Sequence, residues 1–365
     1  MKEQIKAPLN AQVSDRLFFL EFLKAISITA VVSYHAIFLP HSAFVASNGI
    51  LEILFAPLRF CVPVFLTISF LLFERQIAQS SINSTLPLLQ KRLIRLGIPT
   101  LFWFGIAALL KAINGNSFTE IINAMFTGEI FTGAYYLLII LQLMIIFYFI
   151  RSWLNQQKTN IFITIAIQGL VFLFIYATIC GLFGNQVLTF LIKMERILII
   201  YWFVYIALGI YLYKNLSWIE IKSRSLTKTN KILILCFTAA IMMIEYTILT
   251  LVLKNSLRPF DYAAFSCIFS VPAMFICFAS INEKNLPSPV VKLTKLLSKY
   301  SLGIFCINGI LAQIFLSIGT KLFSEANFNL TQIIIIKIIG WIILLTISLL
   351  LSIVLKRLGL KRVVN

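Results

Sequence analysis

The first apolar stretch of the chain, residues 17–39, reads LFFLEFLKAISITAVVSYHAIFL. It is longer than the run of about 20 residues that a helix needs to cross the hydrocarbon core of a bilayer. Three ionisable side chains interrupt it, namely Glu21, Lys24 and His35. Because such groups are costly in contact with lipid, they should face a protein interior or a water-filled cavity. The stretch therefore predicts a membrane-crossing helix with one functional face.

The three ionisable residues share one face of this predicted helix. Lys24 and His35 are eleven residues apart, which is about three helical turns and roughly 16 Å along the axis. A 3-4-3-4 spacing joins Glu21, Lys24, Ile28, Val31 and His35. A carboxylate, an ammonium and an imidazole along one buried stripe indicate chemistry. His35 taken alone would be equally compatible with a packed, hydrogen-bonded core residue.

The chain has only two histidines. An imidazole is the side chain suited to proton transfer near neutral pH, so that role would fall to His35 or His41. His41 follows Pro40 outside the predicted helix, where we expect it to be solvated. His35 is therefore the candidate base.

Apolar segments of similar length recur along the whole chain. Of its 365 residues, 60% are hydrophobic and 12% are charged, which is more apolar side chain than a soluble core can hold. Ten membrane spans are expected, at residues 17–39, 51–73, 96–110, 134–150, 161–180, 197–213, 232–253, 260–280, 302–319 and 333–355. We therefore predict an all-α, polytopic membrane protein that forms a single integral membrane domain over residues 1–365.

The basic residues predict the orientation of these spans. Most of the 31 Lys and Arg residues lie in the N-terminal tail, the C-terminal tail and every second loop. Loops rich in Lys and Arg stay on the cytoplasmic side, so we expect ten crossings with both termini in the cytoplasm. This distribution and attraction to anionic lipids account for the net charge of +18. The sequence contains no basic stripe with aromatic platforms, which is the pattern that would predict a nucleic-acid partner. The six cysteines form no CxxC motif that would indicate a metal site.

Three further charged residues lie deep enough inside predicted spans to matter. Arg59 lies between Pro57 and Pro63, which should bend the helix and free backbone carbonyls. Glu245 lies in the middle of its span. Lys337 is close enough to the outer end of its span for its ammonium to reach the membrane surface by snorkelling.

A basic cluster precedes the third span, in a polar stretch that begins at Glu74. Residues 91–100 read KRLIRLGIPT. Arg92 and Arg95 are one helical turn apart, so together they could hold a phosphorylated cytosolic donor. The alternative is a juxtamembrane anchor that follows the positive-inside rule.

These residues resemble the acyltransferase-3 superfamily of integral membrane O-acyltransferases, which acylate surface polysaccharides and related glycans. Members typically carry an Arg, ten further residues and then a His in the first membrane helix, and Lys24 and His35 match that spacing. Glu21 matches the family's acidic residue three positions before that Arg. The pair Arg92 and Arg95, followed by Ile98-Pro99, resembles the family's paired arginines before the third helix.

Further resemblances follow in the order of the family. They are residues 59–69 (RFCVPVFLTIS), 135–142 (YYLLIILQ) and 300–305 (YSLGIF). The chain departs from the family pattern at three positions. Lys24 replaces an Arg, Phe70 stands where members prefer Gly after Ser69, and Asn308 stands where many members have a His.

The resemblance implies acyl transfer from acyl-CoA to a hydroxyl of a surface glycan or glycolipid. The family resemblance favours acetyl as the acyl group. His35 would act as the general base. Lys24 would bind the donor or stabilise charge on it, with Glu21 holding the ammonium. Arg92 and Arg95 would hold the CoA phosphates.

The expected partners are acyl-CoA as cosubstrate, a carbohydrate acceptor and the lipid bilayer, with no permanently bound cofactor. The expected location is the bacterial cytoplasmic membrane, which the chain would cross many times. The alternative function is a transporter or flippase of a glycan or lipid-linked intermediate, because ten helices with prolines and buried charge suit that class as well.

Overall fold

The computed structural model describes residues 6–80, 85–253 and 259–364, and within these ranges the chain forms helices and no strand. This confirms the all-α prediction. The α-helices are α1 Lys6–Tyr34, α2 Val45–Phe55, α3 Cys61–Ala78, α4 Leu86–Ile113, α5 Phe118–Thr127, α6 Tyr135–Gln156, α7 Lys158–Ile179, α8 Gly184–Lys193, α9 Val204–Lys214, α10 Leu216–Ser225, α11 Lys228–Leu253, α12 Phe265–Phe278, α13 Ser288–Lys299, α14 Ser301–Phe323, α15 Leu330–Arg357 and α16 Lys361–Val364.

Several of these helices are long and apolar enough to cross a membrane. Seven helical stretches in the described ranges meet that condition, namely His41–Ala78, Leu86–Ile113, Tyr135–Gln156, Lys158–Ile179, Lys228–Val252, Ser301–Phe323 and Leu330–Arg357. Two shorter apolar helices are α9 and α12, and α1 is 29 residues long. The chain is therefore a multi-pass membrane protein. Ten crossings and cytoplasmic termini stay predictions.

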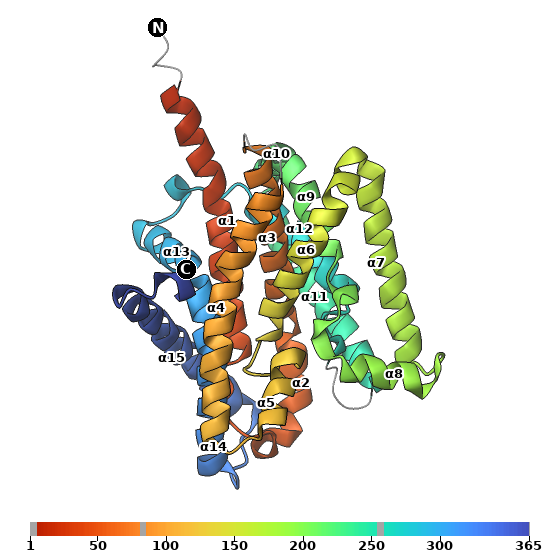
Figure 1. Ribbon diagram of the computed structural model, residues 1–365, viewed down its shortest axis with the longest axis vertical. Coiled ribbons are helices and arrows are strands. Elements are labelled where there is room, and N and C mark those ends of the chain that lie inside the picture. Colours follow the sequence, from red (N-terminus) through yellow and green to blue (C-terminus); the bar gives the residue numbers. More distant parts are fainter. Residues whose placement is uncertain (1–5, 81–84, 254–258, 365) are drawn as a thin grey trace.

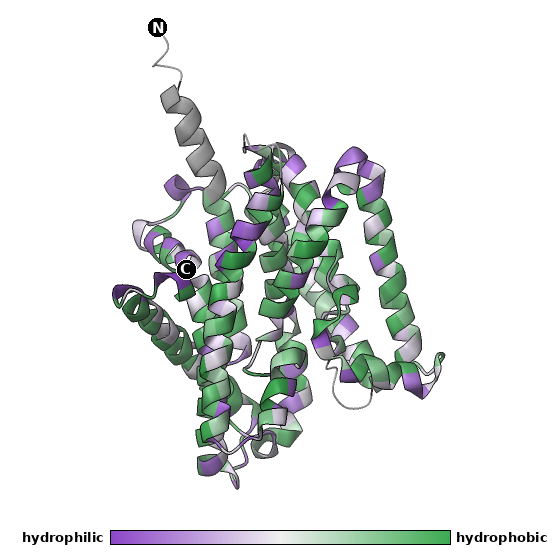
Figure 2. Cartoon of the chain, in the orientation of Figure 1, coloured by the Kyte–Doolittle hydropathy of each residue, from purple (hydrophilic) through white to green (hydrophobic). Residues whose placement is uncertain are grey.

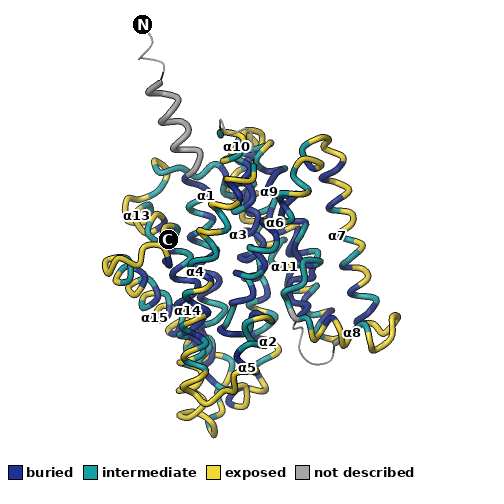
Figure 3. Tube along the Cα trace, in the orientation of Figure 1, coloured by how far each residue is buried: buried dark blue, intermediate teal, exposed yellow. Residues whose placement is uncertain are grey.

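Apolar side chains cover the outer surface of the bundle. Leu101, Phe149 and Leu251 are 74%, 73% and 73% exposed. Figure 2 shows that α7 and α15 are mostly hydrophobic, and Figure 3 shows that much of their surface is exposed. An exposed apolar surface of this extent marks contact with lipid. Hydrophobic residues on these faces therefore serve as the membrane boundary rather than as core.

Two helices form the centre of the bundle. α3 packs against α1, α9 and α12, and α1 also packs against α13, α14 and α15 (Figure 1). Leu23, Ile28 and Val32 of α1 are fully buried. Because the described side chains of α1, from residue 18 onward, pack against protein, its ionisable residues can face an interior instead of lipid, as their cost in hydrocarbon requires.

Irregular backbone lies beside the central helices. The 3₁₀ helices η3 Glu195–Ile197 and η4 Ile199–Tyr201 precede α9, and η5 Phe260–Tyr262 precedes α12. Non-helical backbone at membrane depth is tolerated only where protein buries it and satisfies its polar groups. Gln168 of α7 does this for η4, since its Nε2 donates to the Ile200 carbonyl at 2.6 Å and its Oε1 accepts from the Val204 amide at 3.3 Å.

Candidate active site

A cavity of about 830 Å³ opens between α1, α3, α4, α6, α13 and α14. Most charged residues in its wall are cations. The described residues of the wall include Lys24, Arg75, Lys91, Arg92, Arg95, Lys295 and Lys299, with Glu21 as the carboxylate. Such an excess of positive charge in a partly enclosed space is favourable only with an anion nearby. The cavity is therefore suited to a phosphorylated or otherwise anionic ligand.

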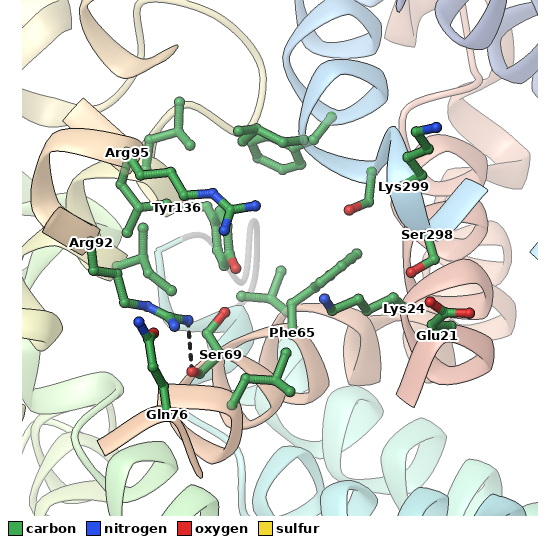
Figure 4. A pocket seen from close by; sticks show the side chains of 18 of the residues that line it. Glu21, Lys24, Phe65, Ser69, Gln76, Arg92, Arg95, Tyr136, Ser298 and Lys299 are labelled. Atoms are coloured by element: carbon green, nitrogen blue, oxygen red, sulfur yellow. Dashed lines mark hydrogen bonds between the residues drawn. The ribbon is translucent and has the colours of Figure 1, made fainter. Parts of the chain in front are cut away.

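Two of the ionisable residues of α1 lie in this cavity. Glu21 and Lys24 occupy one wall, and the Lys24 side chain extends toward the cavity centre (Figure 4). Both side chains belong to the described part of the chain, and no ion pair within 4.0 Å joins them there. Glu21 therefore moderates the positive charge from nearby without fixing the Lys24 ammonium, which stays available to a ligand.

Arg92 and Arg95 occupy the opposite wall. They belong to a helix rather than to a loop, because α4 begins at Leu86 within the polar stretch. Arg92 is held in place, since its Nη2 donates to the Ser69 carbonyl oxygen at 2.8 Å and its guanidinium lies 5.0 Å from the centroid of the Phe73 ring. Arg95 is exposed and points into the cavity (Figure 4). Arg92 thus points into the protein, which favours the ligand-binding interpretation over a lipid anchor.

His35 lies just past the end of α1 and is not one of the residues that line the cavity. Val31, Tyr136 and Phe305 line the cavity, and the ring centroids of the last two are 5.2 Å apart. Phe305 and His35 also flank Gly133. A side-chain carbon added at Gly133 would lie 3.2 Å from the Phe305 ring and 3.4 Å from the His35 ring. Phe305, a residue of the cavity wall, therefore lies close to the imidazole.

A hydrogen bond orients the imidazole. His35 Nδ1 lies 2.8 Å from Oδ1 of Asn308, which is a fully buried residue of α14. The His35 side chain is partly buried. In the sequence, Asn308 was notable only as a departure from the family pattern, and its contact with His35 was not predicted.

The structure corrects the prediction for Lys337. Its side chain does not snorkel, since the residue is only 2% exposed and its Nζ donates to the Ser33 carbonyl oxygen at 2.6 Å. The ammonium also lies 4.2 Å from the centroid of the Phe55 ring. The physical reason is that a cation is stabilised at the C-terminal end of a helix, where carbonyls lack intrahelical partners. Lys337 fills this role for α1.

A second buried charge cluster lies beside the end of α1. Arg59 Nη2 donates to the Tyr34 hydroxyl at 2.7 Å, and its Nε lies 3.8 Å from Asp261 Oδ2. Arg196 makes two hydrogen bonds to the same Asp261 carboxylate, at 2.8 and 2.9 Å. This cluster joins η3 to η5 and fixes Tyr34, the residue before His35. Sequence spacing could not reveal it, because its members come from three distant segments.

Glu245 has a structural role in the described chain. Its carboxylate accepts from the Tyr176 hydroxyl at 2.6 Å and from the amides of Phe265 and Ser266 at 2.8 Å each. Those amides are the first two of α12, whose N-terminus favours an anion. The carboxylate is fully engaged in capping this helix, so it is not a candidate for catalysis.

The fold and the site together define a multi-pass helical membrane protein with a cavity lined mainly by cations and an imidazole near it. A family model described as an acyltransferase domain, Acyl_transf_3, matches residues 17–357, so the chain belongs to the acyltransferase-3 family and is a membrane acyltransferase. Comparisons with curated proteins and with solved structures gave no match.

Proposed function

We propose that this protein transfers an acyl group, acetyl in the first instance, from acyl-CoA to a hydroxyl of a surface glycan or glycolipid. The observation that carries the proposal is the cationic cavity, whose lining residue Phe305 lies close to His35. It combines a place for a phosphorylated donor with a base within reach of its far end.

The donor half of the proposal rests on charge and size. Coenzyme A carries several phosphate oxygens, and arginine is the side chain best matched to phosphate geometry. Arg92, already held by Ser69, would present its remaining N–H groups, and Arg95 would close on the phosphates from the next turn. A volume of about 830 Å³ is within the range of pockets that bind cofactor-sized molecules.

The chemical step assigns the base to His35. Its imidazole would take the proton of the acceptor hydroxyl as that oxygen attacks the thioester carbonyl. The new ester C–O bond forms, the C–S bond breaks, and the imidazolium returns the proton to the departing CoA thiolate. Lys24 would bind a negatively charged group of the acyl donor. Phe305 would turn aside to let the thioester arm pass, because its ring lines the cavity and lies close to His35 beside Gly133.

The proposal includes the orientation in the membrane. With ten crossings and both termini in the cytoplasm, the cavity would open to the cytoplasm, where acyl-CoA is found. Lys91, Lys295 and Lys299 at its wall agree with that side under the positive-inside rule. His35 lies at the other end of α1 from this mouth, so the acceptor would approach from the extracytoplasmic side of the bacterial cytoplasmic membrane.

The test is acyl transfer by the purified protein in lipid nanodiscs. The protein would be incubated with [¹⁴C]acetyl-CoA and glycan or glycolipid extracted from its own host, and labelled ester and free CoA would be measured. Acceptor-dependent ester formation supports the proposal, and repeating the assay with succinyl-CoA and palmitoyl-CoA defines the acyl group. Movement of the acceptor across a vesicle membrane without ester formation would contradict it and favour a transporter.

A further inference from the structure

The hydrogen bonds of the Asn308 side-chain amide show which end is the nitrogen and which is the oxygen. Its Nδ2 donates to the carbonyl oxygens of Ile304 and Phe305, at 2.7 Å each. Carbonyl oxygens only accept hydrogen bonds, so the group that faces them must be the NH₂ of the amide. The other end of the amide, which faces His35, is therefore the oxygen.

This assignment determines where the imidazole carries its proton. Oδ1 of Asn308 has no hydrogen to donate, and it lies 2.8 Å from His35 Nδ1. For the contact to be a hydrogen bond, Nδ1 must carry the proton and donate it. A neutral imidazole has one N–H, so Nε2 must then carry the free lone pair. Isolated histidine prefers the opposite tautomer, with the proton on Nε2.

We infer that Asn308 is a positioning residue, which holds His35 in the Nδ1–H tautomer and so presents Nε2 as the proton acceptor. The catalytic half of this inference rests on the proposed function, whereas the tautomer itself does not depend on it. Asn308 does not line the donor cavity and would not touch acyl-CoA. It acts on the reaction only through the ring that it orients.

The surroundings of His35 make this control effective. The backbone is held two residues earlier, where Lys337 donates to the Ser33 carbonyl oxygen. Gly133 restricts the movement of one side of the imidazole ring, because the Cε1 atom of His35 lies close to Gly133. With the backbone and one side of the ring restricted, the remaining choice is which nitrogen carries the proton. The Asn308 oxygen makes that choice.

The two histidines of the chain allow a direct test. His41 lies in η1 (His41–Phe44), is exposed and stacks on Phe44 at 5.5 Å, so a His41→Asn background leaves His35 as the sole imidazole. Full-length protein labelled with ¹⁵N-histidine in nanodiscs would be examined by NMR at a pH where the ring is neutral. We expect a protonated Nδ1 and an unprotonated Nε2. A ring protonated at Nε2 would overturn the inference.

Two variants distinguish the effect of the Asn308 amide oxygen on the tautomer from the effect of side-chain packing. Asn308→Leu keeps the volume and removes the acceptor, so we expect the Nε2–H form to appear. Asn308→Asp keeps an oxygen opposite Nδ1 and, as a neutral carboxylic acid, can still donate its O–H to the Ile304 or Phe305 carbonyl, so we expect the Nδ1–H form to persist. An unchanged Nδ1–H spectrum in Asn308→Leu would show that another group sets the tautomer, and would overturn the role of Asn308.

Turnover tests the catalytic half separately. Asn308→Leu should lower kcat for acetyl transfer by about 10²-fold, the scale of a lost general base, with the KM for acetyl-CoA unchanged. Asn308→Asp should recover most of the loss. Equal loss in both variants would overturn the positioning role. If the NMR result holds and the parent protein transfers no acyl group, the proposed function fails while the tautomer assignment stands.

Discussion

Lys337 of α15 reaches the last turn of α1, where its Nζ donates a hydrogen bond to the Ser33 carbonyl oxygen at 2.6 Å. The two residues are 304 positions apart in the chain. The contact stabilises the C-terminal end of α1 immediately before His35. A buried ammonium in a membrane helix is expensive, so its use at this point links the packing of α15 to the position of the candidate base.

Replacing Lys337 with Met should lower acetyl transfer by about 10-fold, because a small displacement of the base is costly to a positioned reaction. The folded protein should persist, since Met retains the apolar stem and removes a buried charge. The matched control is Lys321→Met, at an exposed lysine in the last turn of α14. Full turnover in Lys337→Met would remove this residue from the positioning of His35.

His35→Ala should reduce acyl transfer by about 10²- to 10⁴-fold, because it removes the general base. His41→Ala should leave turnover unchanged, since that ring stacks on Phe44 in η1. Both variants would be assayed with [¹⁴C]acetyl-CoA after their membrane expression has been matched. Normal turnover in His35→Ala would end the base assignment.

Lys24→Arg should remain active and Lys24→Ala should lose most activity. The structure places the ammonium in the cavity without an ion-pair partner within 4.0 Å among the described residues, so its charge is available to the donor and an Arg would supply the same charge. The measurement is kcat and KM for acetyl-CoA. An active alanine variant would exclude Lys24 from the reaction.

Replacing Arg92 and Arg95 together with Gln should raise the KM for acetyl-CoA by about 10-fold or more, because each charge-assisted hydrogen bond to phosphate contributes about 1.5–3 kcal/mol. Lys222→Gln is the control, since Lys222 is an exposed cation of α10 outside the cavity. Binding would be measured with a non-hydrolysable acetyl-CoA analogue. An affinity equal to that of the control would return the pair to the anchoring interpretation.

Asp261→Asn should destabilise the protein by about 3–5 kcal/mol, because it leaves the buried Arg59 and the partly buried Arg196 without their counter-charge. The comparison is Glu220→Gln, whose exposed pair with Arg224 should contribute about 0–1 kcal/mol. Thermal unfolding in detergent measures both. Equal midpoints for the two variants would contradict a structural role for the buried cluster.

The departure at Phe70 has an explanation in the packing of α3 against α9. A side-chain carbon at Gly209 would lie 2.6 Å from the Phe70 Cβ and 3.0 Å from the Leu71 amide nitrogen, so the glycine allows α9 to approach the α3 backbone. The Phe70 ring then stacks on Phe147 at 5.8 Å. The bulk added after Ser69 is thus accommodated away from the cavity wall.

Local pattern was enough to predict part of the site. Hydropathy over about 20 residues marks a helix that crosses a membrane, and the helical period places Glu21 and Lys24 on one face of α1. The same period places Arg92 and Arg95 one turn apart on α4. These predictions depend on neighbours within a few turns, so one sequence contains them in full.

The sequence alone determined an all-helical membrane protein with a polar stripe on its first helix and a cationic segment before the third predicted span. Tertiary structure alone decided that Asn308 faces His35 across 273 positions, that Lys337 is buried at the end of α1, and that Phe305 of the cavity wall lies close to the imidazole. The physical reason is the separation along the chain of the residues that interact. Helix formation follows from local hydrogen bonds and side-chain periodicity, whereas contacts between distant helices depend on how whole surfaces pack, and no short pattern in the chain records that.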